Sequence, residues 1–292
     1  MTREIKNIIN IIVFLICIAL VNVAGQNIEL EIRGINAFTF VLIVAVLIQV
    51  IFFIPSYLLK TEKYYDLVGS LTYVTTISLA YFSVENKTSI DTIIYLYVMV
   101  WATRLGIYLF RRVQKDGKDV RFEKAKTHFF WFLQYWMGQA LWVSLTSCAA
   151  IIAILSPEEN SLPILAIVGM ALWLTGFTIE SISDYQKRVF RKENNPSQSF
   201  IHTGLWARSR HPNYFGEITL WTGIAVIALN TLSGVEFITL ISPVFVYILL
   251  TRMSGINLLE RIADERYGEL EEYQWYKRNT PVLFPKLSKN KN

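Results

Sequence analysis

Long apolar stretches separated by short polar segments dominate the pattern of the chain. A helix needs about 20 mostly apolar residues to cross the hydrocarbon core of a bilayer and to satisfy its own backbone hydrogen bonds there. About eight stretches meet this requirement. They predict membrane-spanning helices at residues 8–24, 37–59, 67–84, 92–110, 129–155, 162–183, 214–232 and 237–253. There is no β-barrel alternation and no internal repeat, so the pattern predicts an all-α, polytopic helix bundle.

The composition points to the same class of protein. Hydrophobic residues make up 53% of the chain and charged residues only 17%, whereas an average globular domain carries roughly 25% charged residues. The aromatic content of 14% excludes a disordered chain. The only two cysteines, Cys17 and Cys148, lie inside apolar stretches, which excludes a disulfide scaffold. We therefore predict an integral, multi-pass membrane protein.

The Lys and Arg residues predict the orientation. If the N-terminus is cytoplasmic, the loops on the opposite side of the membrane hold only Arg33 and Lys87, as the positive-inside rule requires. Both termini are then expected in the cytoplasm. These basic loops also account for the net charge of +5, so we expect no nucleic-acid partner.

The first stretch begins with Arg3 and Lys6, so it is either a retained helix or a signal peptide. No small-residue cleavage site is evident near residues 22–26, which favours the retained helix. Cleavage would leave seven spans.

Charged residues are densest at the end of the sixth predicted span. Spacings of three and four residues place Glu180, Asp184, Lys187 and Arg191 along one helix face, with the acids deeper than the bases. A solvated helix end explains the bases alone, because long basic side chains extend to the membrane surface. An acid within the bilayer boundary, such as Glu180, normally needs a buried partner.

The loop after this stripe leads into the seventh span. Pro212 favours the first turn of a helix, where free N–H groups and the helix dipole attract a phosphate or another anion. Arg210 and His211 add charge beside that turn, and Trp206 and Tyr214 add flat faces for stacking. An interfacial aromatic belt is the alternative interpretation of these aromatic residues.

Glu217 and Arg252 are two further polar positions in apolar surroundings. Glu217 lies one turn into the seventh span, where an aromatic belt does not explain it, and Arg252 closes the eighth span. An amphipathic segment then runs from about residue 258 through 272. It is predicted to lie on the membrane surface and to cover the basic loop as a lid.

The sequence contains no recognisable metal-binding or nucleotide-binding motif. His128, His202 and His211 do not form a metal-ligand cluster, so we expect no metal. There is no GxGxxG or Walker sequence, so a bound nucleotide would not be held by a Rossmann domain.

Several short motifs resemble the membrane-embedded steroid and sterol reductase superfamily, in particular its bacterial steroid 5α-reductase-like branch. They are Asp184-Tyr185-Gln186-Lys187, Phe190-Arg191-Lys192, Gly204-Leu205-Trp206, the run from Arg210 to Glu217, Leu259-Glu260, Glu272-Tyr273 and Asp66 to Thr72. The resemblance implies a bacterial inner-membrane protein. It also implies an N-terminal helix and outer loop at residues 1–36, and one reductase-like domain at 37–292 with its cofactor-binding part at about 180–285.

The resemblance further implies that the cofactor is NADPH, bound in a pocket on the cytoplasmic side. Its implied contacts are Asp184, Lys187, Arg191, Trp206, His211, Asn213, Tyr214, Glu260 and Tyr273. To these we add Arg210, Glu217 and Arg252 from their positions in the chain. The pyrophosphate and 2′-phosphate of NADPH require several bases, which fits the stripe and the loop.

The expected reaction is reduction of a carbon–carbon double bond in a lipid-soluble substrate that is steroid, isoprenoid or fatty-acyl-like. Two alternatives stay open. The Arg210-to-Tyr214 run is also similar to isoprenylcysteine and phospholipid methyltransferases, which use S-adenosylmethionine. A non-catalytic scaffold or transporter is the third interpretation, which the gathering of charge at one face disfavours.

The residues that hold the steroid ketone in animal 5α-reductases are not matched in this chain. Their positions resemble Phe53-Ile54-Pro55-Ser56 and Trp101, neither of which donates a proton to a carbonyl. The candidates for the proton donor are Tyr214, Asp66 and Tyr65. Arg104 is the candidate for stabilising developing negative charge. Asp66 is equally explained as the cap of the third span.

Overall fold

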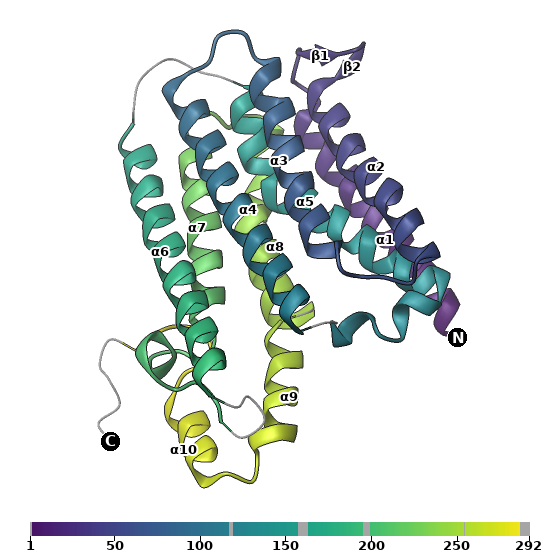
Figure 1. Cartoon of the computed structure of the whole chain (residues 1–292). Helices are drawn as coiled ribbons and strands as arrows, with labels where there is room; N and C mark the ends of the chain where they lie inside the picture. The colour runs from purple at the N-terminus through teal and green to yellow at the C-terminus, as the bar shows by residue number, and fades with distance from the viewer. Residues whose placement is uncertain (1, 117–118, 157–162, 195–198, 254, 287–292) are drawn as a thin grey trace. The chain divides into compact units, whose positions relative to one another are not determined.

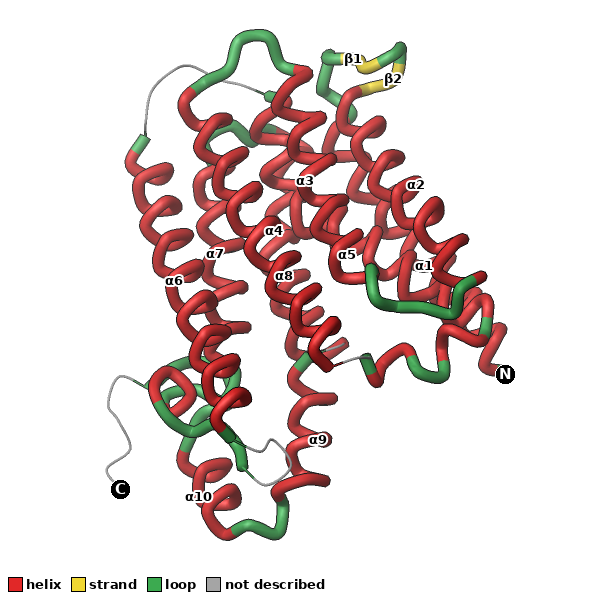
Figure 2. Tube along the Cα trace, viewed as in Figure 1, coloured by secondary structure: helices red, strands yellow, loops and turns green. Residues whose placement is uncertain are grey.

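In a computed structural model, residues 2–116, 119–156, 163–194, 199–253 and 255–286 are described, and almost all of their regular structure is helical (Figures 1 and 2). The helices are α1 (Arg3–Val21), α2 (Ala37–Leu58), α3 (Tyr65–Ser83), α4 (Ser89–Asp116), α5 (Phe129–Leu155), α6 (Ile164–Glu193), α7 (Pro212–Ala228), α8 (Ile241–Ile248), α9 (Ile256–Tyr267) and α10 (Glu271–Asn279). Short 3-10 turns and one π-helical segment, Leu249–Met253, complete them. The predicted all-α fold is confirmed.

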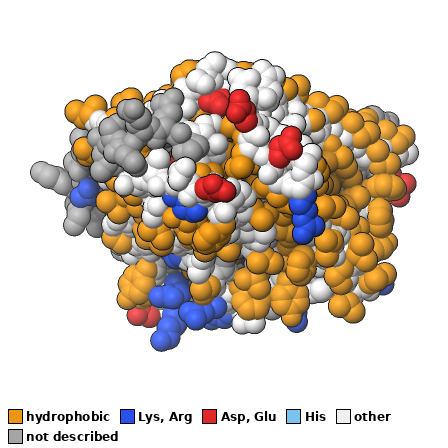
Figure 3. Space-filling view, turned by 90° about the horizontal axis from the view of Figure 1, so that it is seen from above, with side chains coloured by type: hydrophobic (Ala, Val, Ile, Leu, Met, Phe, Trp, Pro, Cys, Tyr) orange, Lys and Arg blue, Asp and Glu red, His pale blue; other side chains and the backbone are white. Residues whose placement is uncertain are grey.

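The described residues contain six segments that are long and apolar enough to cross a membrane. They are Arg3–Gly25, Ala37–Leu58, Ser89–Lys115, Phe129–Leu155, Ile164–Glu193 and Gly234–Tyr267. The other two predicted spans are the helices α3 and α7. Hydroxyl side chains lower the hydropathy of α3, and the 17 residues of α7 extend only about 25 Å. The protein is a multi-pass membrane protein, and hydrophobic side chains are exposed over much of the surface seen in Figure 3.

The chain divides into two compact units, which are described separately. Unit 1 comprises residues 1–167 and 225–242, and unit 2 comprises residues 168–224 and 243–292. The borders between the units pass through α6, α7 and α8.

In unit 1, α5 is the central helix. It packs against α1, α2 and α3, while α4 packs mainly against α3 (Figure 1). Accordingly 89% of the most apolar 18-residue stretch of α5 is buried, against 22% of the corresponding stretch of α1. The only strands among the described residues, β1 (Glu31–Ile32) and β2 (Ile35–Asn36), form a hairpin whose turn residues Arg33 and Gly34 have positive φ. The Asn36 side chain then accepts from the N–H of Thr39 and caps α2.

In unit 2, α6 and α7 approach each other at glycines. A Cβ atom on Gly176 would meet the backbone of Gly216 and Leu220, and one on Gly223 would meet the backbone of Trp173. Small residues of this kind allow membrane helices to pack at close range. The predicted amphipathic segment is two helices, α9 and α10, because the chain turns between Gly268 and Leu270.

Candidate functional site

The short 3-10 turn that carries Trp206 packs against the last turns of α6, within unit 2. The Trp206 indole N–H donates to Ser183 O at 3.1 Å, and the Leu205 N–H donates to Gln186 Oε1 at 3.0 Å. The Lys187 ammonium lies 4.6 Å from the centroid of the Trp206 ring, a cation–π arrangement. The charged stripe and the loop, separate features in the sequence, are therefore in contact.

Arg210, His211 and Glu260 form a partly buried ionic group. Glu260 lies on α9, and its two carboxylate oxygens contact His211 Nε2 at 2.8 Å and Arg210 Nη2 at 3.1 Å. Arg210 also donates from Nη1 to the Lys277 carbonyl on α10 at 2.9 Å. The charge of Arg210 is thus balanced by Glu260, and the guanidinium group bonds the loop to both α9 and α10.

His211 is neutral near pH 7 in this environment. Burial lowers the pKa of His211 below its ordinary value, and this outweighs the opposing effect of its hydrogen bond to Glu260. The neutral ring donates from Nε2–H to the Glu260 carboxylate, which fixes its tautomer. The Tyr214 ring stacks on the imidazole with a centroid distance of 5.6 Å and an interplanar angle of 15°.

The C-terminal tail forms a wall of this site. The N–H of Arg210 donates to Pro281 O at 2.9 Å, and the N–H of His211 donates to Val282 O at 3.1 Å. Ser209 Oγ donates to Leu283 O at 2.8 Å. These bonds satisfy buried backbone groups just before α7 begins.

Aromatic residues of α10 complete the wall. The buried Tyr276 hydroxyl donates to Trp206 O at 2.7 Å, and Tyr273 donates to Asp264 Oδ1 at 3.1 Å. Lys277 bonds the same Asp264 carboxylate at 2.5 Å. Burial raises the pKa of both tyrosines, so both phenols stay protonated donors.

Other predicted contact residues also lie in unit 2. Asp184 is buried on α6, whereas Arg191 is exposed near the end of that helix. Asn213 is half-buried in the first turn of α7, and Glu217 is buried one turn further on. Arg252 is exposed on the π-helical segment that follows α8.

The contacts described above join seven of the twelve predicted cofactor residues into one region of unit 2. These seven are Lys187, Trp206, Arg210, His211, Tyr214, Glu260 and Tyr273. Sequence reasoning assigned no role to five residues that bond Trp206, Leu205, Arg210 or Tyr273, namely Ser183, Gln186, Asp264, Tyr276 and Lys277. Gln186 lies inside a recognised motif, so its position was the available signal.

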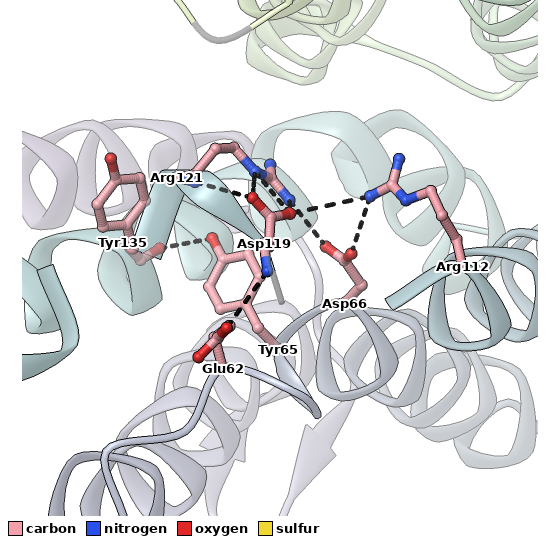
Figure 4. Close-up of polar contacts among 7 residues, drawn as sticks. All are labelled: Glu62, Tyr65, Asp66, Arg112, Asp119, Arg121 and Tyr135. Atoms are coloured by element: carbon pink, nitrogen blue, oxygen red, sulfur yellow. Dashed lines mark hydrogen bonds and ion pairs between the residues drawn. The ribbon is translucent and has the colours of Figure 1, made fainter. Parts of the chain in front are cut away.

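A second charged cluster lies in unit 1 and contains Asp66 (Figure 4). The Asp66 carboxylate lies 3.5 Å from Arg112 Nη2 and 3.6 Å from Arg121 Nη2. The Asp119 carboxylate accepts hydrogen bonds from Arg121 Nε at 3.0 Å, from Nη2 at 2.7 Å and from the backbone N–H at 3.0 Å. Burial alone would raise the pKa of Asp119, but these bonds and the positive charge outweigh it and lower the pKa.

The same cluster connects the start of α3 to the segment before α5. Glu62 is buried, and its carboxylate contacts Lys126 Nζ at 2.8 Å and the Asp119 N–H at 3.3 Å. The Tyr65 hydroxyl donates to Tyr135 O at 2.9 Å. Two of the three candidate proton donors, Asp66 and Tyr65, are therefore engaged in contacts that hold helices together.

A cavity of about 20 Å³ lies next to this cluster, between α3, α4 and α5. Its lining includes Asp66, Ser70, Tyr73, Trp101, Gln139 and Trp142. Arg104 is half-buried on α4 and is not among the lining residues. Of the predicted catalytic residues, Asp66 and Arg104 thus lie in unit 1 and Tyr214 lies in unit 2.

The fold is that of a multi-pass helical membrane protein. Residues 52–280 match the family described as "protein of unknown function (DUF1295)", and the chain belongs to this family. No solved structure matches the chain.

Curated mammalian proteins support the wider relationship. The chain is 31% identical over 121 residues to 3-oxo-5-alpha-steroid 4-dehydrogenase 1 of Mus musculus, a match that covers 41% of this chain and 42% of the relative. It is 30% identical over 119 residues to the Rattus norvegicus protein, with 41% and 40% covered, and 38% identical over 71 residues to the Homo sapiens protein, with 24% and 27% covered. The chain therefore spans less than half the length of the curated relatives it matches. The resemblance drawn from the motifs is confirmed.

Proposed function

We propose that this protein is a membrane-embedded reductase that uses NADPH to reduce a carbon–carbon double bond in a lipid-soluble substrate of steroid, isoprenoid or fatty-acyl type. The proposal rests on one observation in unit 2: the Lys187 ammonium lies over the Trp206 ring, in the loop that leads into α7. The names of the mammalian relatives describe dehydrogenases of 3-oxo-5α-steroids, which supports redox chemistry on a lipid-like molecule.

The residues of this region suit a phosphorylated dinucleotide. Lys187 is half-buried against an aromatic face, and Arg188 and Arg191 are exposed on the same last turns of α6. Three bases at this spacing match the pyrophosphate and the 2′-phosphate. S-adenosylmethionine carries no phosphate and would leave them without a ligand charge to neutralise.

We assign Arg210, His211 and Glu260 a role in positioning the loop. Arg210 and His211, paired with Glu260 on α9, hold the loop in one conformation against the tail. This pre-organisation lowers the cost of ordering the loop when the cofactor binds. The remaining proposed cofactor contacts are Asp184, Asn213, Glu217, Arg252 and Tyr273.

NADPH, when bound, supplies the hydride. The chain must then supply a proton to the second carbon, and we assign this to Tyr214. Its phenol lies in the first turn of α7, half-buried and stacked on a neutral imidazole.

We place both termini and the cofactor region on the cytoplasmic side of a bacterial inner membrane. The support is the loop bias, in which Arg33 and Lys87 are the only bases on the opposite side. Labelling of a single cysteine introduced at Arg33 or at Lys286 with an impermeant maleimide in intact cells tests this placement. Labelling at position 33 alone is expected, and labelling at position 286 alone would contradict it.

A thermal-shift panel on the purified protein tests the function. NADPH is expected to raise the melting temperature by mass action, and NADH to raise it less because it lacks the 2′-phosphate. A shift with S-adenosylmethionine alone would establish the methyltransferase alternative. No shift with any of the three would leave a scaffold or transporter as the better interpretation.

A further inference from the structure

Trp206 lies inside the protein, although its place in the basic loop led us to expect an open aromatic face for stacking. The residue is only 3% exposed. Its indole N–H donates to Ser183 O at 3.1 Å, and its backbone carbonyl accepts from the Tyr276 hydroxyl at 2.7 Å. A base or a nicotinamide can stack only on an open ring face, so Trp206 offers a nucleotide almost no surface.

The turn that carries Trp206 lies close against α6. Gly204 has a φ of +63°, and a Cβ atom at this position would collide with the Gln186 amide group. Glycine therefore permits both the turn and the close approach. Gln186 Oε1 accepts from the Leu205 N–H at 3.0 Å. The protein's own contacts thus fix the Trp206 ring on α6.

The Lys187 ammonium lies over the ring that these contacts fix. Lys187 Nζ is 4.6 Å from the ring centroid, and Lys187 is half-buried. The negative face of an aromatic ring attracts a cation, and Trp is the best of the aromatic residues in this role. A lysine ammonium sits on a flexible four-carbon stem, so the ring restricts it to a small part of its range.

We propose that Trp206 is a positioning residue that acts through Lys187. Its ring holds the ammonium where a phosphate group of the dinucleotide binds, and the ring itself does not touch the dinucleotide. Holding the cation in place reduces the entropy that is lost when the phosphate binds. The inference rests on the proposed function, and it gives Trp206 an indirect role in place of the stacking expected from the sequence.

The position of the ammonium can be measured without any nucleotide. Reductive methylation of the full chain with [13C]formaldehyde converts each lysine to a dimethylamine that keeps its charge, and the Lys187 signal is identified by its loss in Lys187→Arg. Its methyl resonance is expected upfield of the other lysines because of the indole ring current, and Trp206→Leu is expected to abolish this shift. A wild-type Lys187 signal among those of exposed lysines would overturn the proposal.

NADPH titrations of a double-mutant cycle test the role of the contact. Trp206→Leu is expected to weaken NADPH binding by about fivefold, and Trp206→Phe, which keeps a ring, by no more than about twofold. In a Lys187→Ala background Trp206→Leu is expected to cause no further loss, because the two residues act as one unit. Trp206→Met, a longer side chain that also lacks a ring, replaces the Leu variant if that variant does not fold.

A matched control lies in unit 1. The Arg3 guanidinium lies 4.4 Å from the centroid of the Trp131 ring, a cation–π contact of the same kind. Trp131→Leu is expected to leave the affinity for NADPH unchanged. Three results would each overturn the proposal: no loss in Trp206→Leu, the same loss with and without Lys187, or an equal loss in Trp131→Leu.

The same titrations distinguish this proposal from the proposed function. Wild-type protein that binds no NADPH would remove both the reductase assignment and the role of Trp206. Wild-type protein that binds NADPH, with independent effects of Trp206 and Lys187, would leave the reductase assignment standing and remove only the positioning role.

Discussion

The two polar regions of this protein differ in how their central residues are spread along the chain. In unit 2 the loop before α7 supplies Trp206, Arg210 and His211 from consecutive turns of chain, and nearby C-terminal helices fix them. In unit 1 the cluster around Asp66 joins residues far apart in the chain. Arg112 and Asp66 are separated by 46 positions, and Lys126 and Glu62 by 64. A site carried by one contiguous loop is therefore visible in a sequence, whereas a site made by helix packing is not.

The largest expected effect is on stability, from removal of Glu260. Glu260→Ala leaves Arg210 without its counter-ion and His211 without its hydrogen-bond acceptor, and their side chains are only 11% and 7% exposed. Breaking a buried ion pair by deleting one partner costs about 3 kcal/mol. Denaturant unfolding of the detergent-solubilised protein measures this loss.

Glu265→Ala is the matched control for that variant. Glu265 pairs with Arg261 at 3.8 Å on the same helix, but its side chain is 71% exposed. Such surface pairs contribute at most about 0.5 kcal/mol. Similar losses for the two variants would contradict the role given to Glu260.

Removal of Arg121 tests the second region. Arg121→Ala deletes the side-chain bonds to Asp119 and the contact with Asp66, and we expect a loss of about 2 kcal/mol in unfolding free energy. Arg111→Ala, an exposed base on α4, is expected to have little effect. A null result for Arg121 would show that the cluster is not needed to hold α3, α4 and the segment before α5 together.

Removal of one neutral hydrogen bond tests whether the C-terminal wall is a stable part of the site. Tyr276→Phe removes the donor to Trp206 O and is expected to cost about 1 kcal/mol. Tyr185→Phe, at a residue that is 57% exposed, is the control and should change nothing. If Tyr276→Phe is also silent in unfolding measurements, the wall described for the tail is not a stable part of the site.

The smallest effect is a pH dependence from His211. Because burial lowers its folded-state pKa below the ordinary value of 6.5, the unfolded chain binds the proton first. The stability that neutral His211 contributes to the folded state is present above pH 6.5 and is lost as the pH falls below that value. Melting temperatures between pH 7.5 and 5.0 should decline less in His211→Gln than in the wild type, and identical slopes would contradict this assignment.

Helices were the most predictable part of the fold. Residues 129–155 were predicted as a span and form α5 with the same limits, because apolar length alone determines a membrane helix. The eighth predicted span, 237–253, is instead a 3-10 turn, a short α-helix and a π-helical segment. Apolarity predicts that a segment lies in the membrane but does not specify its hydrogen-bond register.

The candidate site was predictable in part, for physical reasons. The motif from Arg210 to Glu217 indicated the loop, and the helical spacing of Lys187 indicated its neighbour on α6. The bond from Tyr276 to Trp206 spans 70 positions, and the backbone bonds of the tail involve no distinctive side chain. Contacts of these two kinds leave no local pattern in a sequence.

The affinity for NADPH of a double variant tests the central claim most directly. Lys187→Ala/Arg191→Ala removes two bases from the last turns of α6, of which Lys187 lies over Trp206. Arg111→Ala/Lys115→Ala removes the same charge from exposed positions in unit 1. The account predicts a Kd at least tenfold weaker for the first variant and unchanged for the second. Wild-type affinity in the Lys187/Arg191 variant would contradict it.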